Sequence, residues 1–195
     1  MRVIRVALLF SVLLVPSIAT AEQVPKARLA KGIYTSPGGE YSVKVPELIG
    51  PHIEERRISP VTTGVFFADD FGRTSYILLI DNRELKATLD DLSNEYVVGD
   101  LLREKSLTTT ARGTELRLLG MNRGASPLVT RTKENGKTVE RPNDLIEAWS
   151  IFLHGDHVYQ AVAGVTPIEG MSETTATERA KLALETLLGG LDLKK

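Results

Sequence analysis

The chain has 195 residues, with 24 Lys and Arg against 25 Asp and Glu, which gives a formal net charge of −1 at pH 7. The basic residues are dispersed among acidic ones, whereas a nucleic-acid-binding domain is usually basic, so we expect no nucleic acid among its partners. The sequence contains no cysteine, which excludes thiol catalysis, a disulfide framework and the lipid-bearing cysteine of a bacterial lipoprotein.

The first 21 residues are typical of a secretory signal peptide. Arg2 and Arg5 precede an apolar run that is too short to span a bilayer, and a small-residue A-x-A pattern ends at Ala21. We therefore expect cleavage after Ala21, a periplasmic or secreted location and no stable membrane anchor. Residues 22–195 are long enough to form a single domain that its hydrophobic core holds together.

The segment SPGGEYSVKVP, residues 36–46, combines two glycines with a strand pattern. A phosphate-binding loop needs a strand before its glycines and a helix after them. Here the alternation of Tyr41, Val43 and Val45 with polar residues predicts a half-buried strand after the glycines. The glycines therefore indicate a tight turn and not a ligand site.

The next two apolar segments predict a β-hairpin. Residues 61–68 and 74–80 flank a turn at residues 69–73. The continuous apolar run at residues 77–80 predicts a strand that is buried on both faces. Helices must therefore cover at least one face of the sheet.

The spacing of the leucines predicts a long amphipathic helix over residues 83–105. Asp81 or Asn82 is suited to cap its N-terminus. Gly99 lies inside this pattern and costs a helix about 1 kcal/mol relative to alanine, so we expect a bend or a close contact there.

A second helix is predicted over residues 172–190 by an apolar stripe that includes Leu184 and Leu188. Thr175 and Glu178 have the spacing of a capping box, and the pair Gly189-Gly190 is a stop signal. We expect this last helix to pack against one face of the sheet.

Two turn signals predict further hairpins between the helices. Asn135-Gly136 is a strong two-residue hairpin signal, and Gly155-Asp156 is a second one. Taken together, the elements predict one α+β domain in which an antiparallel sheet of about six to eight strands is packed by two main helices.

The order of these elements resembles the PsbP-like family, which includes the extrinsic protein of photosystem II and bacterial secreted relatives. The resemblance is carried by GIYTSPGGEYSVKVP near the start, the long helix in the middle, the late hairpin WSIFLHGDHVYQAVAGV and the final helix ending in LLGGL. It implies an αβα sandwich and a non-enzymatic, partner-binding or assembly role. Fold alone does not determine function.

The densest group of metal-ligating side chains is His154, Asp156 and His157. Two imidazoles and a carboxylate within four residues can supply three donors to zinc or copper. The alternative is that these residues are simply the exposed polar residues of a hairpin turn. The remaining histidine, His52, has no sequence signal that brings it to this group.

Two pairs of acids raise the question of carboxylate catalysis. Asp69-Asp70 and Glu54-Glu55 could act as acid and base in glycoside hydrolysis, which needs two carboxylates at a set separation. Solvated loop and edge charges are the simpler interpretation. There is no G-x-S-x-G motif for a serine nucleophile, so the sequence favours a non-enzymatic protein without a cofactor.

The segment RTKENGKTVER, residues 131–141, is a candidate partner-binding hairpin. The basic side chains predicted to contact an acidic partner are Arg131, Lys133, Lys137 and Arg141. The alternative is that these charges protect an edge hairpin from aggregation. Trp149 is a further candidate anchor for a partner, with burial in the core as its alternative.

Three function classes follow. The leading prediction is a binding or assembly module that contacts another envelope protein. The second is a small-molecule or lipid carrier with an apolar cavity between the sheet and its helices. The weakest is a hydrolase that depends on a metal at His154, Asp156 and His157 or on the acidic pairs.

Overall fold

The computed structural model describes residues 20–23, 28–47, 52–68, 75–83, 87–95, 101–126, 129–134 and 137–194. The elements in these ranges are β1 (Thr20–Gln23), β2 (Leu29–Ala30), β3 (Ile33–Thr35), β4 (Tyr41–Lys44), β5 (His52–Arg57), β6 (Thr62–Ala68), β7 (Ser75–Asn82), α1 (Leu89–Glu95), β8 (Leu101–Thr110), β9 (Gly113–Asn122), β10 (Val129–Glu134), β11 (Lys137–Pro142), β12 (Leu145–His154), β13 (His157–Val165), α2 (Glu173–Gly189) and β14 (Leu191–Leu193).

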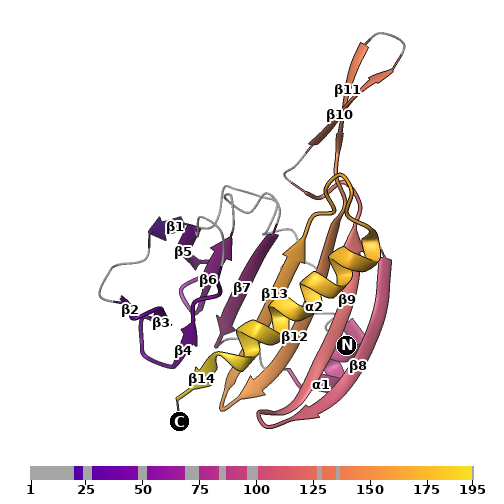
Figure 1. Cartoon of the computed structure of the whole chain (residues 1–195). Coiled ribbons are helices and arrows are strands. Elements are labelled where there is room, and N and C mark those ends of the chain that lie inside the picture. Colours follow the sequence, from indigo (N-terminus) through magenta and orange to yellow (C-terminus); the bar gives the residue numbers. More distant parts are fainter. Residues whose placement is uncertain are drawn as a thin grey trace.

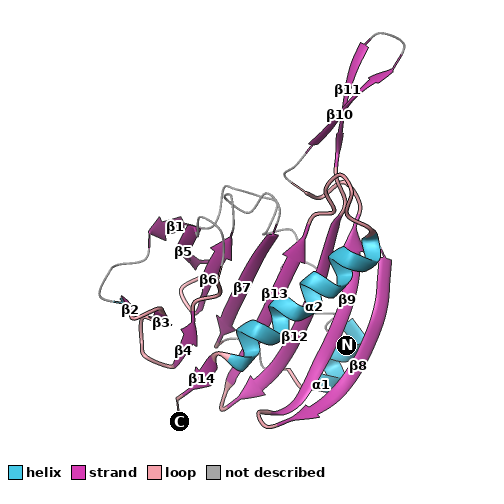
Figure 2. Cartoon of the chain, viewed as in Figure 1, coloured by secondary structure: helices cyan, strands magenta, loops and turns pink. Residues whose placement is uncertain are grey.

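An eight-stranded sheet dominates the fold (Figures 1 and 2). Its strand order is β1-β5-β6-β7-β13-β12-β9-β8, and every neighbouring pair is antiparallel. A four-stranded sheet has the order β14-β4-β3-β2, and β10 and β11 form a two-stranded sheet of their own. The expected α+β class is confirmed, with the sheet as the main component.

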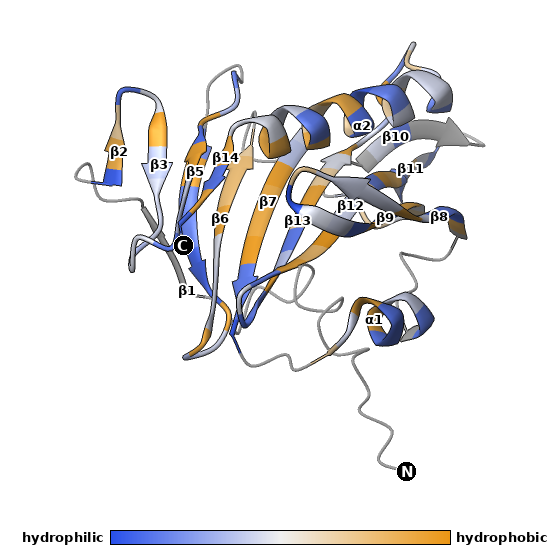
Figure 3. Ribbon diagram, turned by 90° about the horizontal axis from the view of Figure 1, so that it is seen from below, coloured by the Kyte–Doolittle hydropathy of each residue, from blue (hydrophilic) through white to orange (hydrophobic). Residues whose placement is uncertain are grey.

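The large sheet has an apolar core on each face, as its central strands are buried on both sides. One core lies under α2 and the four-stranded sheet and contains Tyr41, Phe152 and Leu187. The other contains Phe66, Trp149 and Leu92, the last of which is contributed by α1. Figure 3 shows α2 and α1 on opposite faces of the sheet, so each helix covers a different core.

The prediction of a long helix over residues 83–105 is wrong. Strand β7 continues to Asn82, which leaves Asp81 and Asn82 in the sheet and not at a helix cap. Helix α1 spans only Leu89–Glu95, and Thr88 accepts a hydrogen bond from the backbone of Asp91 at its start. Residues 101–110 form β8, because pairing with β9 outweighs their leucine spacing. Gly99 lies outside the described residues.

The second helix is confirmed as α2, Glu173–Gly189, with Ala176, Ala180, Leu184, Leu187 and Leu188 buried along one side. The predicted capping box is wrong, because the N-cap is Ser172, whose Oγ accepts a hydrogen bond of 3.1 Å from the backbone of Thr175. Gly190 caps the C-terminus, and β14 then pairs with β4.

The predicted hairpins are confirmed where the structure describes them. Strands β6 and β7 pair across the turn at residues 69–74, which lies outside the described residues. In the β12–β13 hairpin, Gly155 has φ +62°, a conformation that favours glycine and asparagine. Asn135 and Gly136 also lie outside, although β10 and β11 pair directly on either side of them.

Residues 1–19 lie outside the described residues, so the signal peptide stays a prediction, as does cleavage after Ala21 within β1. Neither of the described helices combines the length and the apolar character that a membrane crossing requires.

Candidate functional site

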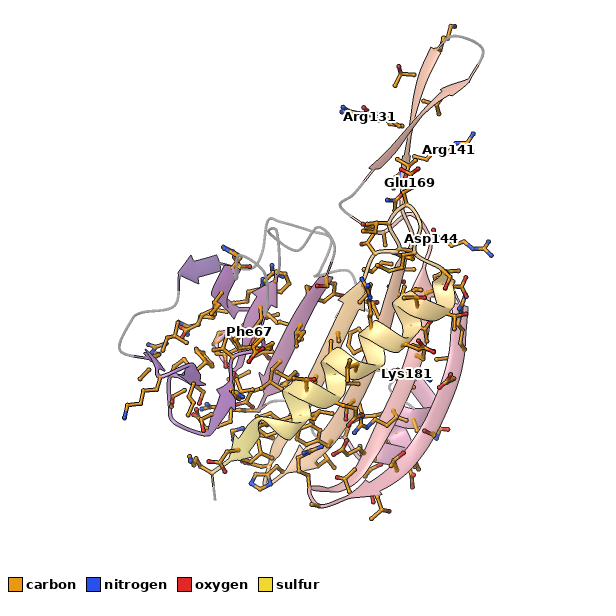
Figure 4. The ribbon with its side chains drawn as sticks, in the orientation of Figure 1. Phe67, Arg131, Arg141, Asp144, Glu169 and Lys181 are labelled. Carbon is orange, nitrogen blue, oxygen red and sulfur yellow. The ribbon has the colours of Figure 1, made fainter. Side chains whose placement is uncertain are left out.

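The β10–β11 hairpin extends away from the body of the protein, as Figure 4 shows with Arg131 and Arg141 on its strands. Arg131, Lys137 and Arg141 are exposed. Nε of Arg131 donates a hydrogen bond of 2.7 Å to Glu140 across the two strands. The side chain of Lys133 lies outside the described residues. The structure therefore brings three of the predicted basic residues together on one projecting element.

Hydrogen bonds hold the base of the hairpin to the large sheet. The backbone of Gly124 donates a hydrogen bond of 3.0 Å to Asp144, and the backbone of Ser126 donates one of 3.0 Å to the carbonyl of Asn143. Ser126 is buried and lies 2.7 Å, oxygen to oxygen, from the hydroxyl of Thr166. These contacts fix the point from which the hairpin leaves the large sheet.

Trp149 is not an exposed anchor. It is only 3% exposed and belongs to the core on the face that α1 covers. Glu147, two residues earlier on β12, lies on the same face of the sheet. The structure therefore shows Trp149 as a buried core residue.

The HGDH segment does not bring its three candidate ligands together. Nδ1 of His157 lies 2.7 Å from the carboxylate of buried Asp81, while Nε2 of His154 lies 3.2 Å from the carbonyl oxygen of Lys194. Asp156 is exposed, 3.4 Å from Nε2 of His157. Among the described residues there is no group of three His, Cys, Asp or Glu side chains arranged to hold a metal.

The acidic pair on β5 is engaged in ion pairs. Glu54 accepts hydrogen bonds from Arg56 and lies 2.9 Å from Nε2 of His52. Glu55, on the opposite face of the strand, accepts hydrogen bonds from Arg28 and from the hydroxyl of Tyr34. Asp69 and Asp70 lie outside the described residues, so no second carboxylate pair is placed against this one.

A groove of about 450 Å³ runs between α2 and the strands β8 and β9. Its floor includes the apolar side chains of Leu119, Ala148 and Leu184. Two ion pairs span its rim from α2 to the sheet, Lys181 with Glu104 at 2.7 Å and Glu185 with Arg117 at 2.6 Å. Leu184 of α2 belongs to the same apolar core as Leu119 and Ala148, and the two ion pairs connect α2 to the edge of the sheet above this floor.

Two buried carboxylates were missed by sequence reasoning. Glu115 is fully buried between Arg112 and Arg117 on the α2 side of the sheet. Glu147 is 2% exposed on the opposite face and accepts hydrogen bonds from Tyr76 and Asn122. The sequence holds a weak signal for Glu147 alone, which is two residues from each of the apolar Leu145 and Trp149, whereas Glu115 alternates with leucines as an exposed acid would.

Burial shifts the pKa of the two carboxylates in the same direction, but their partners differ and the net shifts are opposite. Burial by itself raises the pKa of Glu115, but hydrogen bonds from Thr110 and Ser150 and the charges of two arginines outweigh it and hold the pKa below its usual range. For Glu147, which has no ion-pair partner among the described residues, burial raises the pKa to about 7 in spite of its hydrogen bonds.

Comparison with models of protein families and with curated proteins finds no match. Among solved structures, the chain is similar to a protein of Bacteroides thetaiotaomicron VPI-5482, with 14% sequence identity and a TM-score of 0.41. The match covers 84% of this chain and 48% of the other, so the chain spans about half the length of that protein. A similarity at this level carries no functional inference.

Proposed function

We propose that the protein is a periplasmic or secreted, non-enzymatic module that binds another envelope protein through its β10–β11 hairpin. The observation that carries this proposal is a charged hairpin that forms a separate two-stranded sheet and projects from the body. An isolated two-stranded hairpin is at best marginally stable in water. A partner that packs against the hairpin would supply the missing stabilisation.

The charge of the hairpin indicates the chemistry of that partner. Residues 129–142 contain four basic and two acidic side chains, whereas the whole chain has a net charge of −1. Complementary charge steers association and selects partners. The partner that fits this hairpin is an envelope protein with an acidic surface.

We also propose that the α+β arrangement is a PsbP-like αβα sandwich. What supports it is the confirmed order of an early turn and strand, a late β12–β13 hairpin and a terminal helix, with α2 and α1 on opposite faces. The long middle helix of the resemblance is replaced by short α1 and by β8. Membership of this family would agree with a partner-binding role.

The hairpin proposal is tested by site-specific photo-crosslinking of the full chain in its own cell envelope. A crosslinker at exposed Thr138 on β11 is expected to capture a defined partner, while one at exposed Thr174 on α2 is not. Charge reversal of Lys137 and Arg141 to Glu is expected to reduce the Thr138 crosslink roughly tenfold, because close charge pairs at interfaces are worth a kcal/mol or more. Reversal of exposed Arg179 on α2 to Glu is the control.

Equal crosslinking from Thr138 and Thr174, or a Thr138 crosslink that survives charge reversal, would contradict the proposal. The unfolding transition of each variant should match that of the parent, since the hairpin pairs only with itself among the described strands. A stability change would show that the hairpin is part of the core and not a contact element.

A second candidate function, binding of a small apolar ligand, is favoured by the groove beside α2. Its volume lies within the range of small-molecule sites, and its apolar floor has a charged rim. A fluorescent medium-chain fatty acid is a suitable probe, because its chain matches the floor and its carboxylate can reach Lys181 at the rim.

The substitution Ser106→Trp places a large side chain in this groove from exposed β8, and we expect it to weaken binding of the fatty acid at least tenfold. Lys105→Trp is the matched control, because neighbouring residues of a strand face opposite sides of the sheet. Titration of probe fluorescence with each purified protein gives the affinities. Loss of binding in both variants, or in neither, argues against the groove as the site.

A further inference from the structure

A second and more polar cleft is lined by residues of the four-stranded sheet and its turn and of the strands β5 and β6. Its volume is about 610 Å³, which suits a small organic molecule. The ionisable side chains that line it are Arg28, Arg56, Arg57 and Arg83, with Glu40, Glu55 and the hydroxyl of Tyr34. Four guanidinium groups around one cleft are unusual in a chain whose net charge is −1.

The two carboxylates of the cleft neutralise only part of this charge. Glu55 is occupied by Arg28 and by the hydroxyl of Tyr34, which donates a hydrogen bond of 3.0 Å. Glu40 accepts a hydrogen bond of 2.8 Å from Ser36 and pairs with Arg83. Each carboxylate is thus already held by protein donors inside the cleft.

The remaining arginines differ in their partners. Arg56 is neutralised by Glu54, which lies outside the cleft, and its guanidinium stacks 4.0 Å from the ring of Phe66. Arg57 is exposed and has no ion-pair partner in the part of the chain that the structure describes. Arg83 pairs with Glu40 through a single nitrogen, Nη2, and the same nitrogen lies 3.8 Å from the carboxylate of Asp81, so its other nitrogens remain to be used. Arg57 and Arg83 are therefore the guanidinium groups with donors to offer a ligand.

The turn at residues 36–40 borders the same cleft through Pro37 and Gly38. A Cβ at Gly38 would lie 2.0 Å from a carboxylate oxygen of Glu40. Glycine at this position therefore leaves room for Glu40 to reach Arg83. The glycines form a turn, as the sequence predicts. This turn positions Glu40 next to Arg83 in the cleft.

We propose that this cleft binds a small organic anion, a molecule that carries a phosphate or carboxylate group, through Arg57 and Arg83. The planar guanidinium group presents paired donors that match the oxygens of both groups. Glu40 competes with the ligand for Arg83 and limits its affinity. This site is separate from the β10–β11 hairpin and does not depend on the proposed partner contact.

The test is isothermal titration of the full chain at low ionic strength with glycerol 3-phosphate and with succinate, and with glycerol as the neutral probe. We expect one of the two anions to bind with a stoichiometry of one and glycerol not to bind. Arg57→Ala and Arg83→Ala should each weaken binding roughly tenfold, the effect of losing a hydrogen bond to a charged group. Arg179→Ala on α2 removes the same charge elsewhere and should leave the affinity unchanged.

Glu40→Gln gives the decisive readout, because it is expected to strengthen anion binding several-fold by releasing Arg83. Misfolding of a variant cannot produce a gain in affinity. The proposal is overturned if neither anion binds, if the two arginine variants bind like the parent, or if Glu40→Gln does not tighten binding. Cosedimentation with phosphatidylglycerol vesicles in the absence of binding to either free anion would also overturn it, in favour of a membrane-surface contact.

Discussion

Replacing Glu115 by alanine is expected to lower the free energy of unfolding by about 3–5 kcal/mol, the cost of removing one partner from a buried ion pair. The carboxylate lies 2.8 Å from Arg112, 2.7 Å from Arg117 and 2.8 Å from the hydroxyl of Ser150. Without it, Arg112 would lose its carboxylate partner beneath α2, and Arg117 would keep only the exposed Glu185. Urea denaturation of the parent and the variant measures the difference.

The matched control is Glu185→Ala, because Glu185 binds the same Arg117 from the exposed side. Its side chain is 62% exposed, and exposed ion pairs contribute about 0–1 kcal/mol. A large difference between the two variants is expected. If both cost the same, the buried network around Glu115 would not be the main link between α2 and the sheet edge.

Glu115 also links α2 to the sheet through Arg112, which donates a hydrogen bond of 3.0 Å to the carbonyl oxygen of Leu188 at the end of the helix. Because the pKa of Glu115 in the folded state is lowered, its contribution to stability is present above its unfolded pKa. This contribution is lost as the pH falls below about 4.5. Part of the protein's sensitivity to acid should therefore disappear in Glu115→Ala.

For Glu147 we expect the opposite dependence on pH. Its pKa rises from 4.5 to about 7 on folding, so the folded state binds the proton more tightly than the unfolded state. This contribution to the free energy of unfolding is complete below pH 4.5 and is lost as the pH rises to 7 and beyond. The loss amounts to about 3 kcal/mol, because each unit of pKa difference is worth about 1.4 kcal/mol.

The substitution Glu147→Gln removes this titration while keeping the size of the side chain. As the pH rises from 4.5 to about 7, the parent should lose about 3 kcal/mol of unfolding free energy that the variant does not lose. The variant should therefore gain that much stability relative to the parent. Urea denaturation at a series of pH values measures it. Glu169→Gln, at an exposed position near the hairpin, is the control for the loss of one acidic side chain. A flat difference for Glu147→Gln would mean that its carboxyl is ionised throughout.

The physical basis of the raised pKa is the position of Glu147 under an aromatic side chain. Tyr76 reaches across Gly164 to donate its hydrogen bond to Glu147, and a Cβ at Gly164 would lie 2.2 Å from the ring of Tyr76. Glycine at that position is what lets the ring cross the strand. The ring then keeps water from the carboxyl group, as Tyr76 is itself only 8% exposed.

Local sequence signals determined the elements whose contacts are close in the chain. The apolar stripe from Ala176 to Leu188 defines α2, and the Gly155-Asp156 turn defines the register of β12 and β13. The same is true of the charged β10–β11 hairpin, whose two strands are neighbours in sequence. These elements form because the interactions that specify them span only a few residues.

Only the tertiary structure decided the state of residues 101–110 and of the buried charges. The leucines of residues 83–105 have helical spacing, but β9 offers β8 a ladder of backbone hydrogen bonds that no local pattern reveals. The burial of Glu115 and Glu147 is not evident from the sequence, and the polar cleft brings Arg57 at the end of β5 together with Arg83 directly after β7. Burial and charge pairing depend on which strands lie side by side, and that is settled by long-range packing of the whole sheet.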